Sequence, residues 1–136
     1  MAFRLSTTMR NAGCDGIVDT CEGGTPPAVL KVYTGAQPTN VSDNPSGTIL
    51  GTLTFSNPAF GASATGVATA SAITSDTSAD NSGTALHFAI YTGTALTPLA
   101  DGTCGQGSGD LSFDNNVIVA GGTIAISSFT ITLPIS

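Results

Sequence analysis

Charged side chains are scarce in this sequence, and basic ones are almost absent. Of its 136 residues 9 % are charged, against about a quarter in ordinary soluble domains. The three basic residues are Arg4, Arg10 and Lys31, and the chain from residue 32 onward carries six aspartates and no base. An acidic body of this kind repels phosphate, so we expect no direct binding to nucleic acid.

The sequence also lacks the features of a disulfide-bonded secreted protein and of a membrane protein. Its three cysteines, Cys14, Cys21 and Cys104, show no repeated spacing. A separation of seven residues on a helix places two Cα atoms about 10 Å apart, too far for a bridge, so we expect reduced thiols. Polar residues follow Met1–Leu5, and no stretch approaches 18 apolar residues, so neither a signal peptide nor a membrane helix is predicted.

Motifs for catalysis are missing as well. His87 is the only histidine and no Gly-x-Ser-x-Gly motif occurs, whereas nucleophilic catalysis needs a base held against a nucleophile. We expect His87 to be a satisfied or solvent-exposed residue of a strand. Tryptophan is absent and aromatics make up 6 %, so a sugar cleft built on Asp101, Asp110 and Asp114 is not expected either. These absences predict a protein that is not an enzyme.

Metal and cofactor sites have equally little support. No cysteine or histidine pair has the spacing of a zinc site. Asp76, Asp80 and Asn81 lie in one predicted loop and offer the oxygen ligands that Ca²⁺ prefers, but turn formation is the commoner role of Asp and Asn. The glycine-rich segment 102–107 is followed by no lysine, so it is not a phosphate loop. We expect no metal and no cofactor, with calcium as the alternative.

What the sequence does contain is a series of short segments rich in Thr, Val and Ile, separated by Gly, Asn, Asp and Pro. This pattern is typical of an all-β protein. Within the segment 80–93, Leu86, Phe88 and Ile90 alternate with smaller or polar residues. The alternation predicts the central strand of the core, with these three side chains on its apolar face.

Two further strands are predicted before it. The segment 28–34 would place Leu30 and Val32 inward. A turn-rich connection then leads to the segment 48–55. The large apolar side chains of that segment share one face: Ile49, Leu53 and Phe55.

The C-terminal part predicts a hairpin and a bulge. The segments 117–120 and 123–126 flank Gly121-Gly122, which predicts a hairpin or a tight bend at that point. The apolar positions then change parity before Phe129, which one extra residue at Ser127 or Ser128 would correct. With about seven to nine strands in all, residues 25–136 are predicted to form a two-sheet β-sandwich.

Residues 1–24 differ from the rest and predict a short helical arm. Ser6 or Thr7 can cap a helix, and apolar residues recur at three-to-four spacing from Leu5 to Ile17. A helix of this length is marginal in water, so it needs a surface to lie on. That surface is either its own β body or a neighbouring subunit.

Several stretches, taken in order, resemble a family of small virion proteins encoded in the head-gene modules of tailed bacteriophages. They are Leu5-Ser6-Thr7-Thr8-Met9-Arg10-Asn11-Ala12, Val32-Tyr33-Thr34-Gly35-Ala36-Gln37-Pro38, Gly47-Thr48-Ile49-Leu50-Gly51-Thr52-Leu53, Ser56-Asn57-Pro58-Ala59-Phe60-Gly61, Ser78-Ala79-Asp80-Asn81-Ser82-Gly83-Thr84-Ala85, and 118–121 with 127–134. They cover most of the chain, and their order is more specific than any one of them.

The resemblance implies a structural protein without catalytic activity, a capsid cement or decoration protein with a jelly-roll-like sandwich. It would be made in the host cytoplasm and lie on the outer surface of the capsid. Its partner would be the major capsid protein, and it would form a dimer or trimer whose copies bridge neighbouring capsomers. We expect exposed strand edges or residues of the N-terminal arm to make the contact. The arm residues are Phe3, Leu5, Met9, Arg10, Ile17 and Val18.

A head-fibre or tail-associated module that binds a host receptor or glycan is the alternative. Its site would lie in the loops 36–47, 76–83 and 101–110, because binding residues gather on loops carried by a rigid scaffold. A tail-tube or connector component also fits the size of the chain, but no feature of the sequence favours it.

Overall fold

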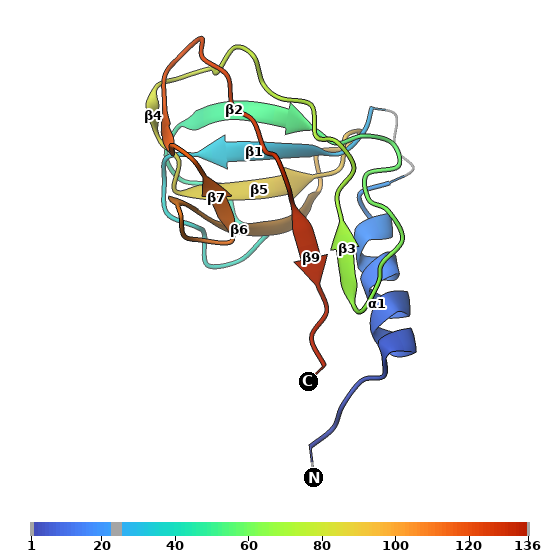
Figure 1. The fold of residues 1–136 in the computed structure, drawn as a ribbon. Coiled ribbons are helices and arrows are strands. Elements are labelled where there is room, and N and C mark those ends of the chain that lie inside the picture. Colours follow the sequence, from blue (N-terminus) through green and yellow to red (C-terminus); the bar gives the residue numbers. More distant parts are fainter. Residues whose placement is uncertain (1, 23–25, 136) are drawn as a thin grey trace.

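The computed structural model describes residues 2–22 and 26–135, which form a mostly β fold with one short helix (Figure 1). The helix, α1, spans Thr7–Asp19. Nine strands lie within the described residues: β1 (Val29–Tyr33), β2 (Ile49–Thr54), β3 (Val67–Thr69), β4 (Gly83–Thr84), β5 (His87–Tyr91), β6 (Pro98–Gln106), β7 (Leu111–Phe113), β8 (Val117–Ile118) and β9 (Thr130–Thr132). The predicted β class is confirmed. The predicted boundary between residues 24 and 25 lies outside the described residues.

Five strands form one curled sheet in the order β2-β1-β5-β6-β7. Neighbouring strands are antiparallel except β6 and β7, which run parallel although only residues 107–110 connect them. Parallel neighbours normally need a much longer crossover. Here Gly107 and Gly109 adopt φ angles of 70° and 82°, in the left-handed region that favours glycine, and so return the chain within a few residues.

Strand β5 lies in the middle of this sheet, as predicted. It pairs with β1 on one side and with β6 on the other. Phe88 and Ile90 are buried on the core side, so their predicted direction is confirmed. The prediction is wrong for Leu86, whose side chain is 45 % exposed, because residue 86 precedes the strand and lies in the link from β4.

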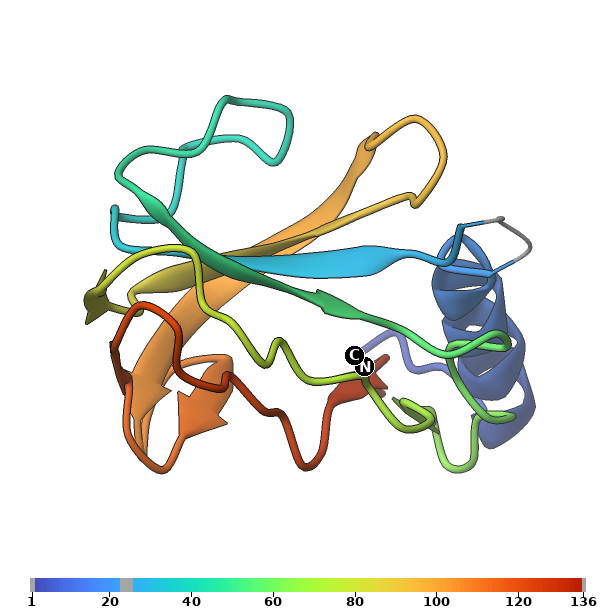
Figure 2. The same cartoon turned by 90° about the horizontal axis from the view of Figure 1, so that it is seen from above.

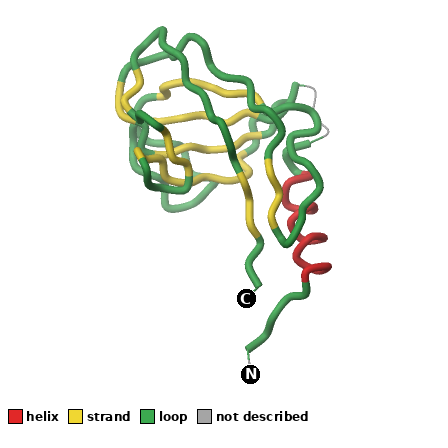
Figure 3. Tube along the Cα trace, viewed as in Figure 1, coloured by secondary structure: helices red, strands yellow, loops and turns green. Residues whose placement is uncertain are grey.

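The core lies between the five-stranded sheet and a second layer of mostly irregular chain. Two small sheets, β3 with β9 and β4 with β8, are the only strand pairs recorded in that layer among the described residues. Figure 2 shows the layer on one side of the large sheet, and Figure 3 shows how much of it is loop. Residues 125–128 belong to no strand, so the bulge predicted at Ser127 or Ser128 is wrong.

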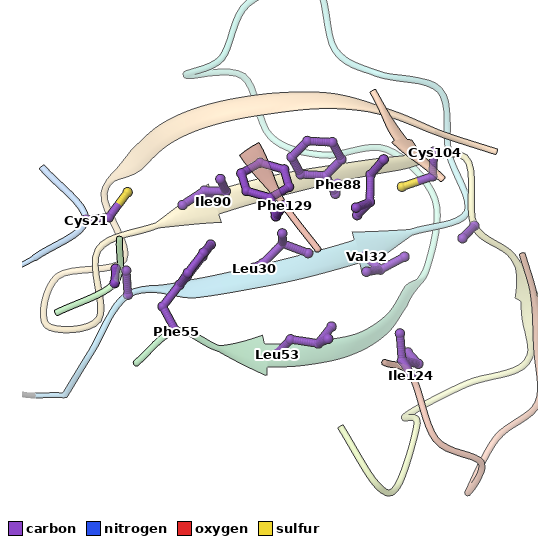
Figure 4. Close-up of a cluster of buried hydrophobic side chains, with 14 of the residues drawn as sticks. Cys21, Leu30, Val32, Leu53, Phe55, Phe88, Ile90, Cys104, Ile124 and Phe129 are labelled. Carbon is purple, nitrogen blue, oxygen red and sulfur yellow. The ribbon is translucent and has the colours of Figure 1, made fainter. Parts of the chain in front are cut away.

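Phe129 joins the second layer to the sheet. Its ring lies 5.8 Å from the ring of Phe88 in an edge-to-face arrangement, and 6.4 and 6.3 Å from the rings of Phe55 and Phe60, measured between centroids. Figure 4 shows Phe129 between Phe88 and Leu30 within the buried cluster. Edge-to-face and tilted pairs of this kind add to the energy of burial itself, so this cluster holds a layer that has few strand hydrogen bonds.

A bulge in β2 changes which side chain enters the core. Tyr33 pairs with Ile49 and Val32 pairs with Gly51, so Leu50 is the extra residue. Leu50 is fully buried, whereas Ile49 is only half-buried. The prediction that Ile49 shares one face with Leu53 and Phe55 is therefore wrong, because a bulge exchanges the parity of the residues before it. Leu53 and Phe55 are buried as predicted.

Of the hairpin or tight bend predicted around Gly121-Gly122, the tight bend is confirmed, because the Gly122 N–H donates to the Val119 carbonyl oxygen at 2.8 Å, and the hairpin is wrong. Instead of pairing with each other, its two arms pair with the segment 76–84: β8 with β4, and Ile124 with Asp76. The Gly121 N–H donates to the Ala79 carbonyl oxygen at 2.8 Å. This arrangement buries Ile118 and Ile124, which a hairpin turned toward solvent would leave exposed.

The glycine-rich loop predicted at 101–110 begins as a strand, because β6 continues to Gln106. Gly102 pairs with Phe88, and a Cβ atom at residue 102 would lie 2.7 Å from the Phe88 ring. Glycine is therefore needed there to let the ring lie flat on the strand. The residue type that predicted a loop serves close packing in this position.

Helix α1 has weak intrinsic stability. It begins after Ser6, whose hydroxyl accepts the Met9 N–H at 3.2 Å, so this predicted cap is confirmed. Its first turn has no acidic residue and its last turn has no basic one, so charges do not complement its dipole. Gly13 and Gly16 weaken it further. Its stability must come from packing.

The helix packs against β3 and β9, two strands of the β body of the same chain (Figure 1). Cys14 and Val18 face inward and are buried. Two helix side chains accept backbone N–H groups of the 63–66 turn at 2.8 Å each: Asn11 from Gly66 and Asp15 from Ser63. Of the two surfaces that the sequence left open, the helix lies on its own body.

Replacing Phe129 by alanine should destabilise the protein by about 3–5 kcal/mol, because it removes the ring that three other aromatics contact. Chemical denaturation followed by circular dichroism gives the free energy of unfolding. Val119, which is 65 % exposed, is the control, and Val119→Ala should change that free energy by less than about 0.5 kcal/mol. Equal effects of the two substitutions would contradict the role of Phe129.

Candidate functional site

The first candidate surface is the side of α1 that faces away from the body, together with Phe3; we call it the helix surface. Its large apolar side chains are 79 % exposed at Phe3, 58 % at Met9 and 47 % at Ile17. Ala12 and Gly16 lie between them and are also exposed. The exposed positions of α1 include one charged residue, Asp19. This surface is apolar and nearly free of charge.

The six predicted contact residues divide between this surface and the interior. Phe3, Met9 and Ile17 belong to the helix surface. Leu5 is half-buried, and its N–H donates to the Ile135 carbonyl oxygen at 2.9 Å. Arg10 is half-buried, and its Nη1 donates to the Thr65 carbonyl oxygen at 2.9 Å. Val18 is 2 % exposed, so its predicted contact with a partner is wrong, because the helix turns this residue toward the body.

Gly16 lies on the helix surface next to Ile17, and nothing within the described chain requires a glycine there. A Cβ atom built at Gly16 has no neighbour within 4 Å, whereas one at Gly13 would lie 2.7 Å from Leu133 Cδ2. The residue is helical, so a left-handed backbone is not the reason either. A glycine inside a helix costs about 1 kcal/mol relative to alanine. Within the described residues, no close contact at Gly16 compensates for this loss of helix stability.

The second candidate surface is the outer face of the large sheet, which we call the tyrosine face: Lys31, Tyr33, His87, Ala89, Tyr91 and Asp101. The strand register places Tyr33 opposite His87, Lys31 opposite Ala89, and Ala89 opposite Asp101. Side chains of alternate residues share a face, so these rows are adjacent. Figure 2 shows that the loops 35–47 and 92–97 both rise on this side of the sheet.

The two tyrosines meet across the middle row. Their hydroxyl oxygens lie 3.3 Å apart, although Tyr33 and Tyr91 are in rows separated by the pair Lys31 and Ala89. The alanine methyl is small enough to leave room beneath this contact, and Ala89 is buried. Burial and the Tyr91 hydroxyl raise the pKa of Tyr33 well above its usual value, so the Tyr33 hydroxyl keeps its proton at neutral pH.

His87 holds the Tyr33 ring in place. It is fully buried, and its ring stacks on Tyr33 with centroids 4.9 Å apart and an interplanar angle of 12°. Nδ1 lies 2.5 Å from the Gly35 carbonyl oxygen, so it carries the proton and donates. Nε2 is buried and has no partner among the described residues. The prediction that His87 is exposed to solvent is wrong. The alternative, that its ring nitrogens have hydrogen-bond partners, holds for Nδ1 only.

Two opposite charges flank the tyrosine pair. The Lys31 Nζ lies 5.4 Å from the centroid of the Tyr91 ring, within reach of a cation–π interaction. On the other side, the Asp101 Oδ1 accepts a hydrogen bond of 2.7 Å from Gln37 Nε2 in the loop 35–47. The tyrosine face therefore combines an ammonium, a pair of tyrosine hydroxyls and a fixed carboxylate–amide pair, and Tyr33 itself is 9 % exposed.

The groups considered for catalysis and metal binding are occupied or dispersed. Asp76 accepts the Thr52 N–H at 2.8 Å through Oδ2 and the Ser78 N–H at 2.9 Å through Oδ1, and Asp80 points into solvent. Across residues 2–22 and 26–135, no three His, Cys, Asp or Glu side chains gather as a metal site would need. Asp76 thus acts as a turn and strand cap. The helix of the described chain is too short to span a membrane.

Three comparisons with known proteins gave no match: no family model, curated protein or solved structure was similar enough to support a relationship. The resemblance to phage virion proteins therefore stays a prediction. The function has to be argued from the two surfaces themselves.

The tyrosine face was not predicted, although the sequence contains a repeated tripeptide that marks it. The echo of Tyr33-Thr34-Gly35 in Tyr91-Thr92-Gly93 marks two strands that end alike and carry their tyrosines with the same parity. What the sequence did not supply was that the two strands are direct antiparallel neighbours, which brings the hydroxyls together.

Cys104 should be an unreactive thiol in the folded protein. Burial raises its pKa to about 12, and the Asp110 carboxylate adds to the effect, so the nucleophilic thiolate is absent at neutral pH. We expect alkylation of Cys104 near pH 8 to be much slower in the native than in the denatured protein, as measured by mass spectrometry of peptides. Similar rates in the two states would contradict this.

The same shift sets a direction for stability. The folded state holds the thiol proton more tightly than the unfolded state, whose value is near 9.0. The contribution of Cys104 to stability is therefore full below about pH 9 and is lost as pH rises toward 12. Cys104→Ala should flatten this part of the curve of unfolding free energy against pH, and an unchanged slope would rule the assignment out.

Proposed function

We propose that the chain is a non-enzymatic structural protein of a tailed-phage virion, a capsid cement or decoration protein. It binds the outer surface of the head, contacts the major capsid protein, and stabilises the shell by bridging neighbouring capsomers. Assembly takes place in the host cytoplasm, and the chain acts as a dimer or trimer. The proposal joins the sequence resemblance to the one observation that carries it, the helix surface.

The helix surface has the character of a protein–protein contact. The fully buried part of an interface is depleted in charge and enriched in aromatic residues and methionine, and this surface presents Phe3, Met9 and Ile17 with little charge. Gly16 and Ala12 between them let another backbone come close. Close packing of a partner against Gly16 would explain why a glycine that weakens the helix occupies this position.

Bridging gives weak contacts a large total effect. A copy that touches two capsomers binds the second one at the high local concentration set by the first. A contact through the helix surface that is weak by itself can then hold a copy on an assembled shell, while free capsid subunits would be bound weakly. This is the behaviour expected of a cement protein.

The proposal extends to the architecture. The large sheet and the layer containing β3–β9 and β4–β8 lie on opposite sides of one core, and we propose that they correspond to the two sheets of a jelly-roll-like sandwich. In this view the second sheet is reduced to short paired stretches. An experimental structure of the chain on the shell tests this directly, since further ladder pairing in that layer is expected on assembly.

Gly16→Ala should stabilise the free protein and weaken its binding to heads. Alanine raises helix stability by about 1 kcal/mol and meets no neighbour in the chain, but its methyl group would hold a partner away. Unfolding curves give the first effect. Co-sedimentation with heads that lack this protein gives the second. Tighter or unchanged binding by the stabilised variant would remove the helix surface from the interface.

Met9→Ser and Val119→Ser form a matched pair that separates the helix surface from apolar exposure in general. The two side chains are 58 % and 65 % exposed, so neither substitution should change stability by more than about 0.5 kcal/mol. Met9→Ser should lower binding to heads about tenfold, whereas Val119→Ser should leave it unchanged. Substitution is preferable to deletion of residues 1–24, because deletion would uncover the surface that Cys14 and Val18 cover.

The alternative is a module that binds a host glycan, and the loops expected for it offer no ring on which a sugar could stack. The segments 36–47, 76–83 and 101–110 contain no aromatic residue, and part of the last is strand β6. The polar groups that favour a ligand are those of the tyrosine face.

A further inference from the structure

The tyrosine face carries the only cation of the β body. Lys31 is the one basic residue in positions 26–135, where all the other charges are acidic. The contact recorded for its ammonium group is the ring of Tyr91. An aromatic ring does not accept all three N–H groups of an ammonium, so Lys31 can donate hydrogen bonds to a group outside the chain.

The tyrosine hydroxyls beside it also have spare capacity. In the contact of 3.3 Å between Tyr33 and Tyr91, one hydroxyl donates and the other accepts, so the accepting hydroxyl still has its own proton to give. Lys31 and this hydroxyl are both donors beside the Tyr91 side chain, and neighbouring donors suit an anionic oxygen. A carboxylate fits this chemistry.

The arrangement is held in place before any ligand binds. His87 fixes the Tyr33 ring by stacking and is itself tied to Gly35. Gln37 fixes Asp101 on the far side of Ala89. Fixed polar groups lose little entropy on binding. Asp101 and Gln37 together provide an acceptor and a donor, which suits the hydroxyl groups that surround a carboxylate on a sugar.

The position of the face in the sheet decides between a peptide and a sugar. Strands β1 and β5 both have neighbours on each side, so their backbones have no free edge to which a peptide strand could add. A ligand must be recognised by side chains alone. Rows of hydroxyl, ammonium, carboxylate and amide groups match the hydroxyls of a saccharide better than a peptide backbone.

We propose that the tyrosine face binds an acidic saccharide, with the sugar carboxylate at Lys31 and the Tyr33–Tyr91 hydroxyls and the sugar hydroxyls at Asp101 and Gln37. This site deepens the glycan-binding alternative and does not depend on the cement role, because it lies on the sheet and not on α1. Attachment to heads and binding of sugars are therefore separate measurements, and either can fail without the other.

The test is a titration of the full ¹⁵N-labelled chain with sodium glucuronate, followed by amide chemical shifts, with glucose as the neutral twin. Saturable shifts confined to 29–35, 87–91 and the Gln37 and Asp101 region, with glucuronate binding more tightly than glucose, support the proposal. No saturable shift at millimolar glucuronate overturns it. Equal affinity for glucose also overturns it, as does response to an aspartate-rich peptide with none to glucuronate.

Three variants locate the site, and their spectra report whether each is folded. Lys31→Gln should lower the affinity for glucuronate about tenfold, and Tyr91→Phe, which keeps the ring under Lys31, about fivefold. Arg4→Gln removes one positive charge from the N-terminal segment outside this face and should leave affinity unchanged. If Arg4→Gln weakens binding as much as Lys31→Gln, the attraction is general charge and the assigned site is wrong.

Discussion

Strand β5 hydrogen-bonds to β1 on one side and to β6 on the other, so its backbone has neighbours at both edges. Its alternate side chains therefore point to the two faces of the sheet. Phe88 and Ile90 anchor the core on one face. His87, Ala89 and Tyr91 set out the tyrosine face on the other. A shift of β5 by one residue would exchange these rows, moving the aromatic anchor out of the core and the histidine into it. The pairing of β5 is thus the constraint on which both the core and the outer site depend.

The parts of the fold that follow from local alternation could be predicted from the sequence. The strands at 29–33, 49–54 and 87–91, the cap at Ser6 and the burial of Leu30, Val32 and Phe88 all depend on residues close together in the chain. The failures depend on partners far away. Leu50 enters the core because of its pairing with β1, and Gly121 forms no hairpin because Ala79 is a competing partner. A glycine in β6 predicted a loop because the Phe88 ring that it accommodates was not visible in the sequence.

The candidate sites show the same division. Met9 and Ile17 were predicted from helical spacing and are exposed, whereas Val18 lies on the same helix but is turned inward. Spacing identifies a stripe of a helix, but the direction of the stripe depends on what the helix packs against. The tyrosine face depends on strand order as well as spacing, so no local pattern in the sequence reveals that Tyr33 and Tyr91 meet.

The two ends of the described chain lie side by side. The Leu5 N–H donates to the Ile135 carbonyl oxygen at 2.9 Å, and Figure 1 shows both ends projecting from the same pole of the molecule, beside α1. A label, affinity handle or foreign domain joined to either end would therefore emerge at one place, close to the helix surface. Reporter fusions at the two ends would crowd the same neighbour, and a handle that leaves this pole clear has to be inserted elsewhere, for instance in the exposed tip of the 35–47 loop.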